Sequence, residues 1–138
     1  MTRAVIDTNL LVSGLLNDSG APAKLILRWL KGQFDTLISD ETMNEYAYIL
    51  HHLPEINQRK ADDLLGELRI SGIRVAILGT LQVCKDADDD KFLETAVNGE
   101  ADYLVTKNTK HFPRKSYQNV RIVKVSKFLE ELEKQFSN

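Results

Sequence analysis

Acidic side chains stand at three separated places in the sequence where they could act together on a metal ion. Asp7 follows a short apolar run, Glu45 lies within a predicted helix, and four aspartates lie in the acidic run 86–90. Four aspartates in five positions repel one another at neutral pH and exceed what capping one helix requires. Carboxylate oxygens are the ligands that hard divalent cations prefer. The pattern indicates a divalent-metal site, and the alternative is a solvated acidic loop.

Each acid also has an ordinary structural explanation. Asp7 is suited to capping a helix, and Glu45 shares a solvated helix face with Glu41. The acidic run is not an EF-hand, because the sixth position lacks a glycine and the twelfth is Val97 instead of a glutamate. Only the convergence of the three stretches in space would favour the catalytic interpretation.

A basic stretch follows the predicted strand that ends near Thr106. Cations beside a carboxylate cluster suit a phosphodiester enzyme, because they hold the phosphates that flank the scissile bond. A solvated loop is the alternative, and the histidine in this stretch is a weak metal-ligand candidate because no second histidine is spaced with it. The stretch contains Lys107, Lys110, His111, Arg114 and Lys115.

Strands and helices alternate along almost the whole chain. This alternation predicts an α/β fold with a mostly parallel sheet and helices on both faces. In such sheets ligands bind beyond the carboxyl ends of the strands, which is where Asp7 and Asn108 are expected. The predicted strands are Ala4–Ile6, Thr36–Ile38, Arg74–Leu78, Tyr103–Thr106 and Val120–Val125. The predicted helices cover 22–31, 40–52, 56–71 and 91–98, and a last helix is capped by Ser126.

The composition fits one soluble domain spanning residues 1–138. The chain has 138 residues, a net charge of −2 and a single cysteine, Cys84, so it can form neither an internal disulfide nor a thiolate zinc site. We expect a cytoplasmic protein without a membrane span, because the longest apolar run is too short to cross a bilayer. Glycine-rich phosphate loops and a nucleophilic serine elbow are both missing from the sequence.

Four segments in this order resemble the PIN-domain nucleases, especially the branch described as toxins of bacterial and archaeal toxin–antitoxin pairs. They are Val5–Asn9, Ser39–Glu45, Asp88–Leu93 and Ala101–Thr106. The resemblance implies a three-layer α/β/α fold with a Rossmann-like five-stranded sheet. It also implies dependence on Mg²⁺ or Mn²⁺ and single-stranded RNA as the substrate.

The resemblance also assigns catalytic acids. The family's first acid corresponds to Asp7, its helical glutamate to Glu45, and its third acid best to Asp90. Asp88 and Asp89 are neighbours that could replace Asp90 as metal ligands. All of these carboxylates are expected to share one cation.

A fourth acid often follows the threonine of the fourth strand in this family, and Asn108 stands there instead. That departure removes a charge but leaves three acids. Asn108, Thr8 and Asn9 are expected to position water or substrate oxygens. The expected contacts to the RNA backbone come from Lys107, Lys110 and Arg114.

The resulting expectation is a metal-dependent endoribonuclease that hydrolyses single-stranded RNA. A cognate antitoxin and a homodimer are implied by the resemblance alone. The alternatives are a non-catalytic RNA- or protein-binding domain of the same fold and a metal-dependent phosphatase.

Overall fold

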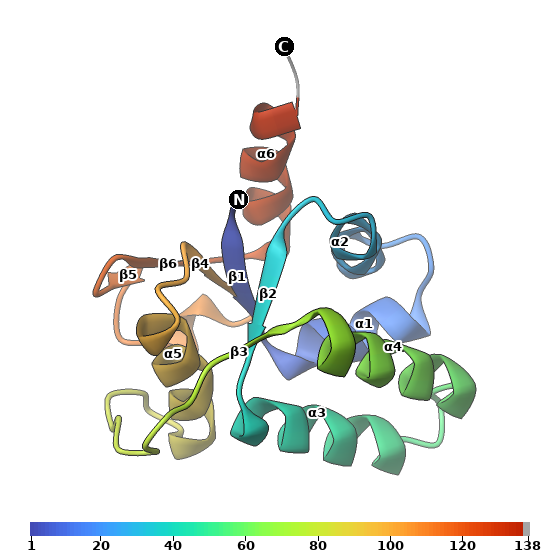
Figure 1. The fold of residues 1–138 in the computed structure, drawn as a ribbon, viewed down its shortest axis with the longest axis horizontal. Coiled ribbons are helices and arrows are strands. Elements are labelled where there is room, and N and C mark those ends of the chain that lie inside the picture. The colour runs from blue at the N-terminus through green and yellow to red at the C-terminus, as the bar shows by residue number, and fades with distance from the viewer. Residues whose placement is uncertain (137–138) are drawn as a thin grey trace.

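A six-stranded sheet with the order β3-β2-β1-β4-β6-β5 runs through the centre of the protein (Figure 1). The structure, a computed structural model, describes residues 1–136. The four neighbouring pairs in the order β3-β2-β1-β4-β6 are parallel, and the edge strand β5 is antiparallel to its neighbour β6. The predicted α/β class with a mostly parallel sheet is therefore confirmed. The strands are β1 (Arg3–Ile6), β2 (Asp35–Ile38), β3 (Ile73–Arg74), β4 (Tyr103–Val105), β5 (Ser116–Tyr117) and β6 (Val120–Val123).

The sheet differs from the prediction at both edges. The third strand was predicted over Arg74–Leu78 but covers only Ile73 and Arg74. At the end of the predicted range the backbone N–H of Leu78 donates to the side chain of Glu94 and not to a neighbouring strand. The sixth strand, β5, was not predicted. It forms a hairpin with β6 through Gln118 and Asn119, whose φ angles of 44° and 72° suit a tight turn between antiparallel strands.

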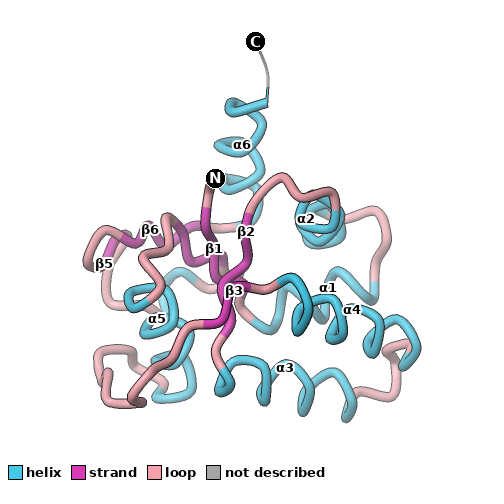
Figure 2. The backbone as a smooth tube through the Cα atoms, viewed as in Figure 1, coloured by secondary structure: helices cyan, strands magenta, loops and turns pink. Residues whose placement is uncertain are grey.

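Helices flank the strands, as the trace in Figure 2 shows. They are α1 (Thr8–Leu16), α2 (Ala21–Leu30), α3 (Asp40–His52), α4 (Gln58–Ser71), α5 (Ala87–Asn98) and α6 (Val125–Phe136), with a short 3₁₀ turn over Thr109–His111. Within residues 1–136, no helix has both the length and the apolar character needed to cross a membrane.

The central strands are buried on both faces. Val5 of β1 and Leu104 of β4 have no exposed surface. Helices cover both faces of these strands, which is why their sequences are continuous apolar runs without alternating polar residues. On one side of the sheet, Phe128 of α6 meets Phe34 edge to face, with ring centroids 4.9 Å apart. β1 and β4 pair in parallel with Ile6 opposite Val105, so the carboxyl ends of the two strands lie side by side.

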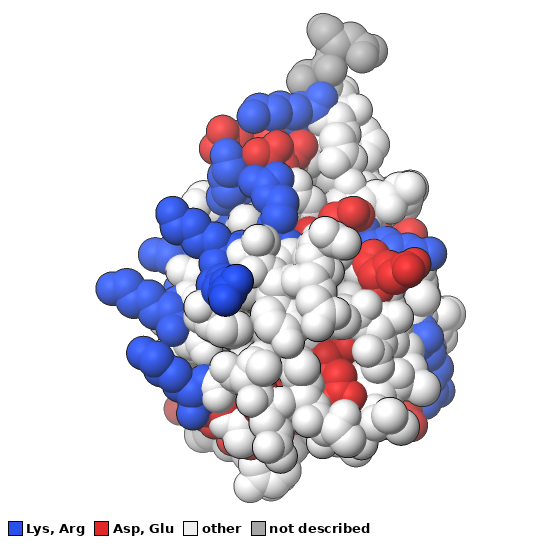
Figure 3. Space-filling view, turned by 90° about the vertical axis from the view of Figure 1, so that its left-hand side faces the viewer, with Lys and Arg blue, Asp and Glu red and all other residues white. Residues whose placement is uncertain are grey.

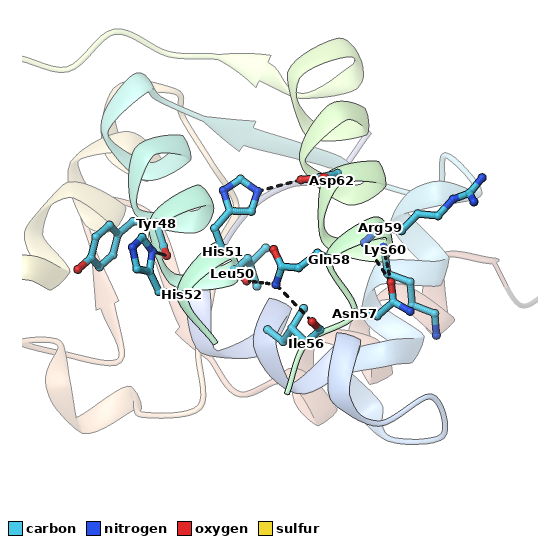
Figure 4. A network of polar contacts seen from close by, with 10 residues as sticks. All are labelled: Tyr48, Leu50, His51, His52, Ile56, Asn57, Gln58, Arg59, Lys60 and Asp62. Atoms are coloured by element: carbon cyan, nitrogen blue, oxygen red, sulfur yellow. Dashed lines mark hydrogen bonds and ion pairs between the residues drawn. The ribbon is translucent and has the colours of Figure 1, made fainter. Parts of the chain in front are cut away.

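The hairpin between α3 and α4 is held by side chains that bond to the backbone (Figure 4). Nε2 of Gln58 donates to the carbonyl oxygens of Leu50 at 3.0 Å and Ile56 at 3.3 Å. His51 Nε2 lies 2.8 Å from Asp62 Oδ1, which joins the two helices on their exposed side. These contacts fix the helix that carries Glu45.

Replacing Asn57 with alanine is expected to lower the free energy of unfolding by about 1 kcal/mol. Asn57 caps α4, because its Oδ1 accepts from the N–H groups of Arg59 and Lys60 at 3.0 and 3.1 Å. Asn57→Asp keeps an oxygen acceptor and should retain the stability of the wild type. Urea unfolding of the two variants measures the difference, and equal losses in both would contradict the capping role.

Candidate active site

Asp7 ends β1 beside the carboxyl end of β4. It occupies the N-cap position of α1, but its side chain makes no capping hydrogen bond. Instead Oδ2 accepts from the hydroxyl of Thr106 at 2.7 Å. Burial is the main cause that raises the pKa of Asp7, and the charge of Glu45 raises it further. The buried carboxylate is therefore held at the sheet edge, where the sequence predicted a ligand site.

Glu45 reaches the same edge from α3. Its Oε2 accepts a hydrogen bond from the hydroxyl of Thr8, the residue after Asp7. Its Oε1 lies 2.9 Å from Nζ of Lys91, and that ammonium also donates to the carbonyl of Asp88 at 2.8 Å. Glu45 is thus held in place by a hydroxyl and a cation.

Asp89 lies in the first turn of α5. Its Oδ2 is buried without a hydrogen-bond partner and lies 3.4 Å from Nδ1 of His111. Burial raises the pKa of Asp89 to about 6, and Asp7 is the charged neighbour that raises it most. The negative charge of Asp7 therefore adds to the effect of burial in disfavouring the charged form of Asp89.

Asp90, the sequence-based choice for the third acid, serves the adjoining loop instead. Its Oδ1 accepts from the backbone N–H groups of Val83 at 3.1 Å and Cys84 at 2.8 Å. The reason is that α5 begins at Ala87, earlier than the predicted Lys91. Successive helical residues differ by 100° in direction, so Asp89 and Asp90 point to different sides of the helix, and Asp90 points to the loop of Val83 and Cys84.

The other members of the acidic run have ordinary positions. Asp86 caps α5 by accepting from the N–H of Asp88 at 2.9 Å. The side chain of Asp88 is exposed. The positions of Asp86 and Asp88 therefore need no metal ion to explain them, whereas Asp89 has a buried carboxylate oxygen without a hydrogen-bond partner.

The expected positioning residues divide into two groups. Thr8 is buried and bonded to Glu45, whereas Asn9 is exposed. Asn108 is also exposed, and its backbone N–H donates to the hydroxyl of Thr106 at 3.1 Å. In the loop after β4, the ammonium group of Lys107 donates a hydrogen bond to the hydroxyl of Ser13, and the side chains of Lys110 and Arg114 are exposed.

Two residues at this site were missed by sequence reasoning. Thr106 links Asp7 to the loop of Asn108, and its place at the end of an apolar strand was the available signal. Lys91 neutralises Glu45, and nothing in its sequence position distinguishes it from a surface lysine.

The site has an excess of negative charge that a cation would relieve. Among the described residues, no three carboxylate, imidazole or thiol groups already enclose an ion-sized space. However, Oδ2 of Asp89 accepts no hydrogen bond, and burial raises the pKa values of both Asp7 and Asp89, so their charged forms lack the stabilisation that a bound cation would give. Carboxylate oxygens suit Mg²⁺ or Mn²⁺, so these donors fit such an ion.

The raised pKa of Asp89, caused first by burial and then by the charge of Asp7, predicts a pH-dependent stability difference. A folded-state pKa near 6 lies above the ordinary value of 3.8, so the folded chain binds the extra proton between these two pH values. In metal-free protein, Asp89→Asn should therefore match the wild type below about pH 4, become relatively more stable as the pH rises from about 4 to 6, and keep that advantage without further change above pH 6. Thermal unfolding in chelator at each pH measures this, and a difference that is the same at pH 4 and pH 7 would contradict it.

Comparison with known proteins places the chain in a family. Residues 3–110 match the PIN domain family. An uncharacterised protein of Methanocaldococcus jannaschii is 22% identical over 96% of this chain and 92% of its own length. VapBC2 of Rickettsia felis, solved bound to a DNA fragment from its promoter, has a chain with the same fold. The match has a TM-score of 0.56 and 17% identity, and covers 89% of this chain and 98% of that one. Because the family match spans most of the sequence, including Asp7, Glu45 and Asp89, the chain belongs to the PIN domain family, whose members are in general nucleases.

Proposed function

We propose that this protein is a divalent-metal-dependent endoribonuclease that hydrolyses phosphodiester bonds of single-stranded RNA. The observation that carries the proposal is a chain of contacts that links three chain segments at the carboxyl edge of the sheet. Thr8, next to Asp7, donates to Glu45, and Lys91, which pairs with Glu45, donates to the carbonyl of Asp88, the residue before Asp89. Family membership supports the nuclease activity, and the basic loop beside the acids favours a polyanionic substrate.

In this proposal Asp7 and Asp89 would hold the ion, with Mg²⁺ or Mn²⁺ as the candidates. When bound, the cation stabilises the charge that develops on the phosphate. Glu45, fixed by Thr8 and Lys91, accepts a hydrogen bond from the attacking water and orients it.

The neighbouring polar residues bind substrate. Asn108 and Asn9 are exposed near Asp7 and Thr106 and can donate to phosphate or water oxygens. Beyond them Lys107, Lys110 and Arg114 contact the phosphates on either side of the scissile bond.

Incubation of labelled single-stranded RNA with the purified chain tests this function. We expect cleavage with Mg²⁺ or Mn²⁺, none with chelator, and none with Asp7→Asn. A rise in thermal midpoint on adding Mn²⁺ gives a readout independent of activity, because a ligand that binds only the folded state must raise it. Activity on a phosphomonoester without RNA cleavage would instead identify a phosphatase, and a chain inert with both substrates would be a binding protein.

The family resemblance extends the proposal to a cellular role as the toxin of a toxin–antitoxin pair, inhibited by a cognate antitoxin and acting as a homodimer. Induced expression in a bacterial host should arrest growth, and Asp7→Asn should not. Growth unaffected by an active wild-type enzyme would refute the toxin role without affecting the nuclease assignment.

A further inference from the structure

The basic residues of this acidic chain are concentrated in one segment. Residues 103–129 contain seven Lys and Arg and no Asp or Glu, although the whole chain carries a net charge of −2. This segment includes β4, the following loop, the β5–β6 hairpin and the start of α6. Figure 3 shows Lys and Arg side chains gathered along one border of the face that it presents.

The segment continues the edge of the sheet that carries the acids. The N–H of Thr106, whose hydroxyl bonds to Asp7, donates to the carbonyl of Val123 at 3.0 Å. Lys124 therefore follows at the carboxyl end of the strand beside β4. A hollow of about 480 Å³ lies there, lined by residues that include Thr109, Lys115 and Lys124.

Two of the lysines at this hollow have no neutralising partner. Within residues 1–136, neither Lys115 nor Lys124 has a carboxylate oxygen within 4.0 Å of its ammonium. In contrast, Arg121 and Lys127, which also line the hollow, both pair with Glu131. Lys115 and Lys124 therefore carry positive charges that no ion pair in the described part of the chain uses, and they lie in a hollow next to the proposed active site. Such charges attract an anionic ligand.

We propose that this hollow, the Lys115–Lys124 groove, binds the RNA backbone as the strand leads away from the scissile phosphate. The proposal rests on the proposed function and extends it. Asn108, which we propose binds substrate next to Asp7, is followed directly by Thr109, and Thr109 is part of the groove lining, so the groove adjoins the proposed cleavage site. The groove therefore supplies a phosphate subsite beyond Lys107, Lys110 and Arg114.

The double variant Lys115→Gln/Lys124→Gln tests the groove in chelator, where RNA binds without being cleaved. Fluorescence anisotropy with labelled single-stranded RNA should show a roughly tenfold weaker affinity at about 0.1 M salt, and the slope of log affinity against log salt should fall by about 1.4 for two lost contacts. With metal added, the KM for the same RNA should rise while kcat stays unchanged.

Lys24→Gln/Lys31→Gln provides the matched control. These exposed lysines belong to α2 and the residue after it, across the molecule from the β5–β6 hairpin (Figure 1). The control should retain wild-type affinity and salt slope. Equal affinity of the groove variant and the control would overturn the proposal. Weaker RNA binding by the groove variant in a chain that fails to cleave RNA would retain the groove and reject only the nuclease function.

Discussion

Asp89→Asn is expected to reduce metal-dependent RNA cleavage at least about 100-fold while the protein remains folded. Changes to residues that merely support metal ligands cost about 10- to 100-fold, so loss of a ligand should cost no less. The metal-free variant should also be more stable at pH 7, on the order of 1 kcal/mol after allowance for solvent screening of a partly exposed group. The rise in thermal midpoint caused by Mn²⁺ should shrink or disappear.

Asp88→Asn is the matched control for this result. It makes the same change of charge one residue earlier in α5, on an exposed side chain. Cleavage and the response to Mn²⁺ should both remain at the wild-type level. The assignment of Asp89 fails if its variant cleaves RNA as fast as the Asp88 variant.

Asp90→Ala is expected to destabilise the protein by about 3 kcal/mol. The substitution leaves the N–H groups of Val83 and Cys84 without their charged acceptor, and each hydrogen bond to a charged group contributes about 1.5–3 kcal/mol. Glu94 binds the preceding part of the same loop through Leu78, Gly79 and Leu81, so the loss should remain local.

Asp90→Asn separates this structural role from a catalytic one. The amide keeps an oxygen acceptor for the two N–H groups, so the variant should fold and retain metal-dependent cleavage. Urea unfolding and the RNA assay on both variants provide the measurement. If Asp90→Asn were as inactive as Asp89→Asn, Asp90 would belong to the metal site after all.

The fold could be predicted because its signals are local. Buried parallel strands are short apolar runs, and helices begin at capping residues such as Ser39, which forms a capping box with Thr42. The short strands at the sheet edges were harder to identify, because two-residue strands carry too little pattern. β5 depends on a hairpin turn at Gln118 and Asn119, which lacks the usual glycine.

The site could be predicted only to the level of a cluster. The sequence indicates that Asp7 and the acidic run lie near the sheet edge, but not which aspartate turns inward. That choice depends on the residue at which α5 begins, and helix boundaries are the least certain feature of a sequence pattern. The pairing of Lys91 with Glu45 depends on packing between two helices, which no local signal reports.

The pairing of β1 with β4 has a consequence for synthesis of the protein. Asp7 and Thr106 are 99 positions apart, and the strands that carry them are adjacent in the sheet. During translation the first strand leaves the ribosome long before its partner, and a contact over such a loop forms late because its closure entropy must be overcome first. A nascent chain that ends before β4 therefore lacks the Thr106 hydroxyl that holds Asp7, so the proposed active site is completed only after β4 has been synthesised.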